Sequence, residues 1–190
     1  CRKNKRNTIN ALKFEKHLEE NLFELIEEIE LGKYQPGRSI AFIVNYLVKR
    51  EVFAADFRDR VVHHWLINRL NPYFERAFIY DSFACRVNKG THFGIKRIDH
   101  FIREGSANYK NDCYILKLDV KGFFMHINRN LLFERLKVFI DQHYHENDKE
   151  LVKDICYKVV FNDPTMNCII KGSKNDWKEL PKSKSLFSTP

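Results

Sequence analysis

The sequence predicts an α+β fold in which helices dominate and a small antiparallel sheet lies among them. Apolar residues recur at helical spacing over several long stretches, and two short neighbouring stretches have the pattern of strands. Strands and helices do not alternate regularly along the chain, which argues against a parallel βαβ arrangement. The 190 residues are enough to bury a hydrophobic core.

The first expected elements are a basic arm, a long helix and a hairpin. Residues 1–7 are basic and polar, and one helix is predicted from about Thr8 to Leu31, with Gly32 placed to end it. Residues 39–46 place Ile40, Phe42, Val44 and Tyr46 on one face and predict a strand, and residues 49–54 are its expected antiparallel partner.

The elements after the hairpin are mostly helices. Asp56 is a suitable N-cap for a second helix, which the Asn-Pro pair at 71–72 is expected to end. No definite element is predicted beyond residue 162. The other expected elements are a buried strand over residues 114–119 and helices over residues 93–103, 129–142 and 149–161.

Charge and cysteine usage bear on partners and compartment. Lys and Arg number 33 against 25 Asp and Glu, and the net charge of +8 suits a polyanionic partner, although a basic protein without a nucleic-acid role is the simpler alternative. The five cysteines are scattered without a C-x-x-C pair, which argues against structural zinc and favours a reducing, cytoplasmic location. No apolar run approaches the roughly 20 residues needed to span a bilayer, so no membrane partner is expected.

The residues most suggestive of chemistry lie in Tyr114–Arg129. Strand-forming residues lead to one carboxylate, Asp119, which precedes a turn at Gly122 and two aromatic residues, Phe123 and Phe124. Carboxylate oxygens are the ligands that Mg²⁺ prefers, and the ion usually keeps waters and substrate phosphates as its other ligands. The alternative is that Asp119 only forms a turn, as aspartate before glycine often does.

Several stretches of the chain resemble bacterial reverse transcriptases, particularly those of group II introns and diversity-generating retroelements. The run around Asp119 resembles motif A of the palm, and the likeness covers roughly residues 12–190. The stretches that resemble the fingers and upper palm are, in order, Arg50–His64, Leu70–Glu75, Phe78–Arg86 and Lys89–His92.

The resemblance implies fingers over residues 1–112 and part of the palm over residues 113–190. It implies RNA-directed DNA polymerase activity with an RNA template, a DNA or RNA primer, deoxynucleoside triphosphates and two Mg²⁺ ions. The segment Trp177–Phe187 resembles the stretch that comes before the family's Gly-Leu-Pro motif, and the second catalytic motif, an aromatic-x-Asp-Asp hairpin, does not occur in the sequence. We therefore expect a fragment that is inactive alone and catalytic only in a longer parent.

The resemblance also assigns roles around motif A. Asp119 would bind both metals, and the carbonyl of Val120 would complete one coordination sphere. The backbone at Gly122 and Phe123 would lie under the triphosphate, and Phe124 falls where the family has its ribose gate. Core packing is the alternative for the two rings, and strand alternation predicts one ring inward and the other at the site.

Basic residues complete the predicted site. Arg50 lies in the strand that the family uses to reach over the incoming nucleotide, and a guanidinium forks well onto phosphate oxygens. Lys49 is a second candidate contact, because Leu47-Val48-Lys49 stands where many relatives have Pro-Lys-Pro. Scattered surface charge is the alternative for the other cations. The predicted strip of phosphate contacts consists of Arg58, Arg60, Arg69, Arg86 and Lys89.

Two other interpretations stay open. The chain could be a non-catalytic RNA-binding module of a retroelement or intron ribonucleoprotein, in which Asp119 is structural. It could also be an unrelated α+β interaction protein. A retroelement enzyme would have an accessory RNA-binding protein as a possible further partner.

Overall fold

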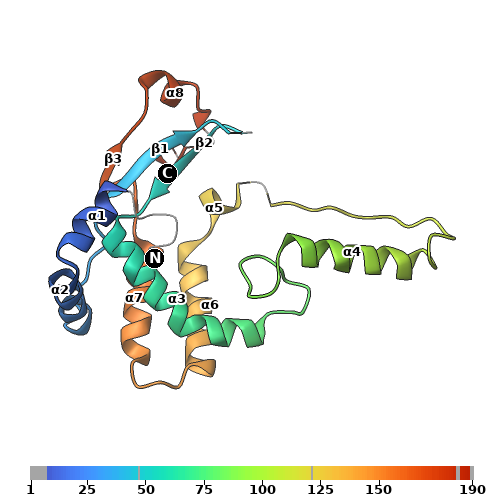
Figure 1. Cartoon of the computed structure of the whole chain (residues 1–190), viewed down its shortest axis with the longest axis horizontal. Coiled ribbons are helices and arrows are strands. Elements are labelled where there is room, and N and C mark those ends of the chain that lie inside the picture. Colours follow the sequence, from blue (N-terminus) through green and yellow to red (C-terminus); the bar gives the residue numbers. More distant parts are fainter. Residues whose placement is uncertain (1–7, 47, 121, 183–184, 189–190) are drawn as a thin grey trace. The chain divides into compact units, whose positions relative to one another are not determined.

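Helices form most of the elements in the described part of the chain, and its strands form one small sheet (Figure 1). The computed structural model describes residues 8–46, 48–120, 122–182 and 185–188, so the expected basic arm at 1–7 lies outside the described residues. The described residues up to Leu70 and from Gly122 onward form one compact unit, called unit 1, and residues 71–120 belong to unit 2.

Unit 1 contains the sheet and most of the helices. Its elements are α1 (Ile9–Lys16), α2 (Leu18–Glu30), β1 (Ser39–Val44), β2 (Arg50–Ala54), most of α3 (Phe57–Ala77), α5 (Phe123–His126), α6 (Arg129–His143), α7 (Lys149–Phe161), β3 (Cys168–Ile170), α8 (Lys174–Lys178) and the 3-10 turn Leu186–Ser188. Unit 2 contains the end of α3 and α4 (Thr91–Gly105). Together these elements confirm the helix-rich α+β class.

The sheet has the strand order β2-β1-β3. β1 and β2 pair antiparallel, from Ile40 opposite Ala54 to Val44 opposite Arg50, which confirms the predicted hairpin. β3 pairs parallel with β1, so the sheet is mixed rather than purely antiparallel. The sequence did not predict β3 because three residues are too few to show an alternating pattern.

The hydrophobic core of unit 1 gathers between the first helices and the start of α3. Ala11, Phe14 and Phe57 are buried together, with the rings of Phe14 and Phe57 5.4 Å apart. α7 buries Val152 and Ile155 completely. Helices α1, α3 and α7 therefore each contribute buried side chains to unit 1.

The predicted helix over residues 8–31 is wrong as a single element. It breaks at His17, whose φ of −127° and ψ of 51° are not helical. The side-chain amide of Asn21 donates to the carbonyl of Phe14 at 2.9 Å and so satisfies one of the groups that the end of α1 leaves unpaired.

The predicted stop at residues 71–72 is also wrong, because α3 continues through Pro72 to Ala77. Proline removes one backbone hydrogen bond from a helix, and its ring tends to kink the helix. Pro72 is exposed, and the guanidinium of Arg76 donates to its carbonyl at 3.2 Å. α3 thus continues past Pro72 with one backbone hydrogen bond fewer.

The predicted strand at 114–119 is wrong as well. Residues 113–120 form neither helix nor strand, and all of them are exposed. Tyr114, Leu116 and Leu118 are 93%, 81% and 80% exposed. The run pairs with no strand among the described residues, and this is why it is not a strand.

The expectation that Phe123 and Phe124 face opposite ways as strand neighbours is wrong too, because both lie in the short helix α5. Neighbouring helix residues point about 100° apart. The ring of Phe123 is half exposed, and the side chain of Phe124 lies outside what the structure describes. None of the helices in the described residues is apolar over enough length to cross a membrane.

Candidate functional site

The run that ends at Asp119 belongs to unit 2, and the turn that follows it begins unit 1 again at Gly122. Asp119 and Val120 lie in unit 2, and both are exposed. Gly122 begins α5 in unit 1 with φ +63°, in the left-handed region that favours glycine.

Two observations explain the glycine at position 122. A Cβ on Gly122 would meet Nδ1 of His126 at 2.8 Å, closer than real Cβ atoms come to such neighbours. The same Nδ1 atom lies 2.9 Å from the carbonyl oxygen of Gly122. The left-handed φ therefore favours glycine in the turn after Asp119, and the exposed His126 side chain would have to shift if a Cβ were added.

Asp119 is a single carboxylate and not part of a metal-binding cluster among the described residues. Within residues 8–46, 48–120, 122–182 and 185–188, no three His, Cys, Asp or Glu side chains gather in a way that could hold an ion. A two-metal site needs several carboxylates. The described residues therefore do not form a complete Mg²⁺ site, and Asp119 with the carbonyl of Val120 could supply only part of one.

The two candidate nucleotide contacts on the hairpin differ in their availability. The guanidinium of Arg50, the first residue of β2, is exposed and makes no hydrogen bond or ion pair with the described residues. The ammonium of Lys49 is engaged by the carboxylate of Glu179. Arg50 is thus the cation of the hairpin that is free to meet a ligand.

Sequence reasoning missed a segment that holds the hairpin in place. Glu51 on β2 accepts hydrogen bonds from the hydroxyl of Ser185 at 2.6 Å and from the backbone N–H of Leu186 at 3.0 Å. The rings of Phe53 and Phe187 lie 5.5 Å apart. Only the aromatic residues of the tail signalled this contact, and nothing in the sequence indicated their partner.

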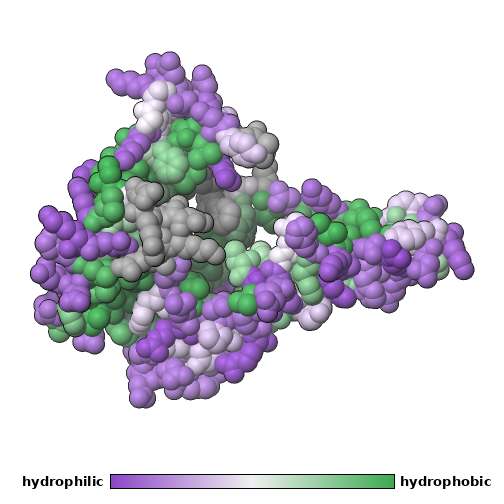
Figure 2. All heavy atoms as spheres, viewed as in Figure 1, coloured by the Kyte–Doolittle hydropathy of each residue, from purple (hydrophilic) through white to green (hydrophobic). Residues whose placement is uncertain are grey.

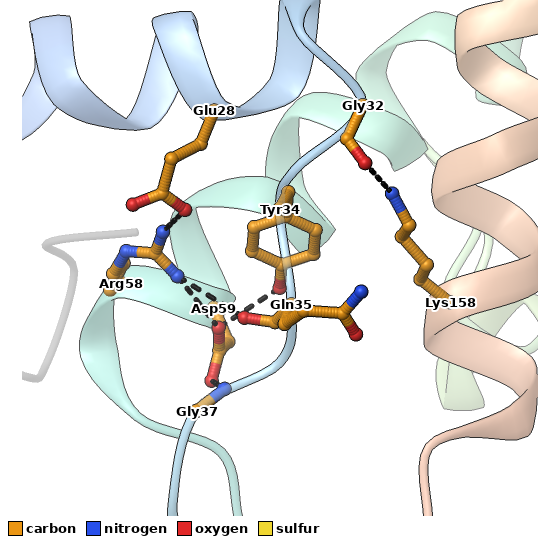
Figure 3. Close-up of polar contacts among 8 residues, drawn as sticks. All are labelled: Glu28, Gly32, Tyr34, Gln35, Gly37, Arg58, Asp59 and Lys158. Carbon is orange, nitrogen blue, oxygen red and sulfur yellow. Dashed lines mark hydrogen bonds and ion pairs between the residues drawn. The ribbon is translucent and has the colours of Figure 1, made fainter.

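The start of α3 is tied to the loop before β1 through a buried carboxylate (Figure 3). Asp59 accepts hydrogen bonds from the Tyr34 hydroxyl and from the Gly37 N–H, both at 2.9 Å. Burial, reinforced by the neighbouring Asp59 carboxylate, raises the pKa of Tyr34 far above its ordinary value. The pair therefore stays as a neutral phenol donating to a carboxylate.

Arg58 belongs to the same network. Its guanidinium pairs with Glu28, lies 3.8 Å from a carboxylate oxygen of Asp59 and lies 5.2 Å from the centre of the Tyr34 ring (Figure 3). Arg58 is thus engaged in holding α2, α3 and the intervening loop together. Close to this network, the ammonium of Lys158 on α7 donates to the Gly32 carbonyl at 2.7 Å.

The other cations of the predicted strip also have intramolecular partners. In unit 1, Arg60 donates to the Ala55 carbonyl at 3.0 Å, and Arg69 lies 3.3 Å from Asp148. In unit 2, Arg86 is nearly buried against Glu75, with Nε 2.8 Å from a carboxylate oxygen. The strip stays a prediction, and the structure gives these side chains structural contacts as well.

Unit 2 carries a cluster of cations over aromatic rings. Arg97 lies 5.3 Å from the centre of the Tyr80 ring and 4.6 Å from that of Phe101, and Lys89 lies 4.1 Å from that of Tyr80. Arg97 also donates two hydrogen bonds to Asp81, at 2.6 and 3.0 Å, which lower the pKa of that carboxyl. We call Tyr80, Asp81, Lys89, Arg97 and Phe101 the Tyr80 cluster.

A scan against protein-family models finds no matching family, and a search of curated proteins finds no match. The likeness to reverse transcriptases therefore depends on the motifs and their order.

Proposed function

We propose that the chain is the fingers and part of the palm of an RNA-directed DNA polymerase. The observation that carries the proposal is the glycine-dependent left-handed turn at Gly122, three residues after Asp119. In the proposal, Asp119 and the Val120 carbonyl contribute to a Mg²⁺ site that further carboxylates complete, and the protein acts in the cytoplasm.

The residues of the hairpin and the turn have distinct tasks in this proposal. Arg50 binds phosphate oxygens of the incoming deoxynucleotide, since its guanidinium is exposed and stays charged. Gly122 lets the backbone approach the triphosphate without a side chain in between. Phe124 restricts the space beside the sugar, so that a ribonucleotide binds less well.

Primer extension tests this proposal. The protein is a chain that carries these residues together with a second catalytic motif, supplied with an RNA template, a primer, Mg²⁺ and deoxynucleotides. Asp119→Ala is expected to abolish extension while template binding persists, and Asp112→Ala, which removes another exposed carboxylate of unit 2, serves as the matched control. Full extension by the Asp119→Ala protein would refute the assignment.

The isolated 190 residues are expected to extend no primer, because they supply one catalytic carboxylate where the chemistry needs more. Magnesium-dependent nucleotide addition by this chain alone would contradict that expectation. An accessory RNA-binding protein is a further partner in the retroelement version of the proposal.

The Tyr80 cluster favours a second candidate, a non-catalytic RNA-binding module. Aromatic faces and cations side by side stack bases and contact phosphates with little sequence preference. In this candidate, Tyr80→Ala weakens the salt-dependent binding of single-stranded RNA, whereas Asp119→Asn changes neither RNA binding nor the function of the parent. Loss of extension on changing Asp119 separates the two candidates.

A further inference from the structure

Unit 1 has an apolar groove of about 400 Å³ beside α2. Most of its lining is hydrophobic, and it comes from α2, from α3 and from the region where α7 begins. The lining includes Leu22, Ile26 and Glu30 of α2, Trp65 and Arg69 of α3, and Asp148.

The apolar surface continues past the groove along α2. Ile26 at the groove is 48% exposed, and Phe23 is also exposed. At about 100° per residue, Glu19, Phe23, Ile26 and Glu30 fall on one side of the helix. In Figure 2, hydrophobic residues lie among hydrophilic ones where Figure 1 draws α2. A ligand that filled only the groove would leave this stripe exposed.

The stripe is bordered by negative charge. α2 has six glutamates among its 13 residues, in a chain whose net charge is +8. Glu19 and Glu30 form no ion pair within the described residues, whereas Arg69 and Asp148 in the groove lie 3.3 Å apart and offset each other. Since Glu30 is eleven positions after Glu19, the two residues lie about 16 Å apart along the helix axis.

We propose that this groove binds the apolar face of a basic amphipathic helix from a protein partner. Apolar side chains of that helix would enter beside Ile26 and Trp65, and its Lys or Arg residues would meet Glu19 and Glu30. Charge complementarity selects this occupant, because a nucleic acid would face uncompensated carboxylates. The mode is that of a helix laid in a hydrophobic groove, and the inference does not depend on the polymerase proposal.

The fluorescence of Trp65 gives a direct readout. The only other tryptophan is Trp177, so the Trp177→Phe protein reports from Trp65 alone. The probe is a synthetic Leu/Lys amphipathic helix of about 14 residues, long enough to span the two carboxylates. Saturable quenching or a blue shift is expected with this peptide, and neither with a Leu/Glu helix nor with a Ser/Lys peptide.

Matched variants locate the binding. Ile26→Glu is expected to weaken the Leu/Lys peptide at least about tenfold. Ile67→Glu is the control, since Ile67 is similarly exposed at 52% but does not line the groove. Glu19→Lys with Glu30→Lys should transfer the preference to the Leu/Glu helix, whereas Glu24→Lys, on the other side of α2, should not. Circular dichroism checks that each variant is folded.

Three results would overturn the proposal. Equal weakening by Ile26→Glu and Ile67→Glu would show that the peptide does not use the groove. Loss of RNA binding in the Ile26→Glu protein would assign the surface to nucleic acid instead. Self-association of the unmodified chain that disappears in the same variant would make a second copy the occupant.

Discussion

Replacing Asp59 by alanine should destabilise unit 1 more than almost any other single polar substitution. The side chain is 2% exposed and accepts two hydrogen bonds, one from a fully buried tyrosine, Tyr34, and one from the Gly37 N–H. Leaving the buried Tyr34 hydroxyl without a partner costs about 1 to 3 kcal/mol, and the partly buried Gly37 N–H adds a smaller cost. The free energy of unfolding should therefore fall by about 2 to 4 kcal/mol. Arg58 keeps Glu28 as its partner.

Urea unfolding followed by tryptophan fluorescence measures this loss. Trp65 and Trp177 both belong to unit 1, so the transition reports on that unit. Tyr34→Phe removes only one of the two donors and should cost about 1 kcal/mol. Glu24→Gln changes an exposed side chain on α2 and is the control. It should unfold at the same urea concentration as the unmodified protein.

Two outcomes of the unfolding measurements would contradict this prediction. A loss below about 1 kcal/mol for Asp59→Ala would mean that the buried donors find other partners, against the expected cost of leaving them unpaired. Equal losses for Tyr34→Phe and Asp59→Ala would mean that the Gly37 contact contributes nothing. The free energy of unfolding of the Asp59→Ala protein is expected to be well below that of the Tyr34→Phe protein.

Three further predictions follow from burial and exposure. Burial raises the pKa of the Cys156 thiol to about 12. A maleimide should therefore label exposed Cys85 and leave Cys156 unlabelled until the protein unfolds. Equal labelling of the two cysteines, measured by peptide mass spectrometry, would contradict this. Burial lowers the pKa of His63, so on going from about pH 7.5 to about pH 5.5 the unfolded chain takes up the proton first and stability falls. His63→Gln should flatten that dependence in urea unfolding, and an unchanged slope would count against it. The exposed residues 113–120 should make the protein associate at high concentration, as measured by sedimentation velocity. The double variant Leu116→Lys with Leu118→Lys should associate less. Association that persists in this variant would place the contact elsewhere.

The hairpin and three of the helices were predicted from the spacing of apolar residues along the chain. The strand pattern of residues 39–46 predicted the hairpin together with residues 49–54, and helical periodicity predicted α4, α6 and α7 to within two residues at each end. The apolar spacing did not determine which face is buried, since β1 buries Ser39 and Ala41, and Ile95 and Ile98 of α4 are 57% and 51% exposed. The helix bounds at His17 and Pro72 were predicted wrongly, because the chain breaks at a histidine and continues through a proline.

Features that join distant residues were not predictable in the same way. The Asp59 carboxylate meets Tyr34 and Gly37 across more than twenty residues, and β3 reaches β1 from the far end of the chain. The sequence indicated neither Glu51 as an anchor for the tail nor the groove beside α2. Such contacts depend on packing geometry, which no periodicity encodes.

The run Tyr114–Val120 has the sequence pattern of a strand but pairs with no strand among the described residues. Its apolar residues alternate with Lys117 and Asp119, as in a strand with one buried face, yet the run is exposed and pairs with no strand among the described residues. A strand exists only through hydrogen bonds to a second strand. A partner that paired with this run would bury Leu116 and Leu118 and fix the carboxylate of Asp119 in the same step. The energy of that burial, rather than any residue near Asp119, would then hold the proposed ligand in place.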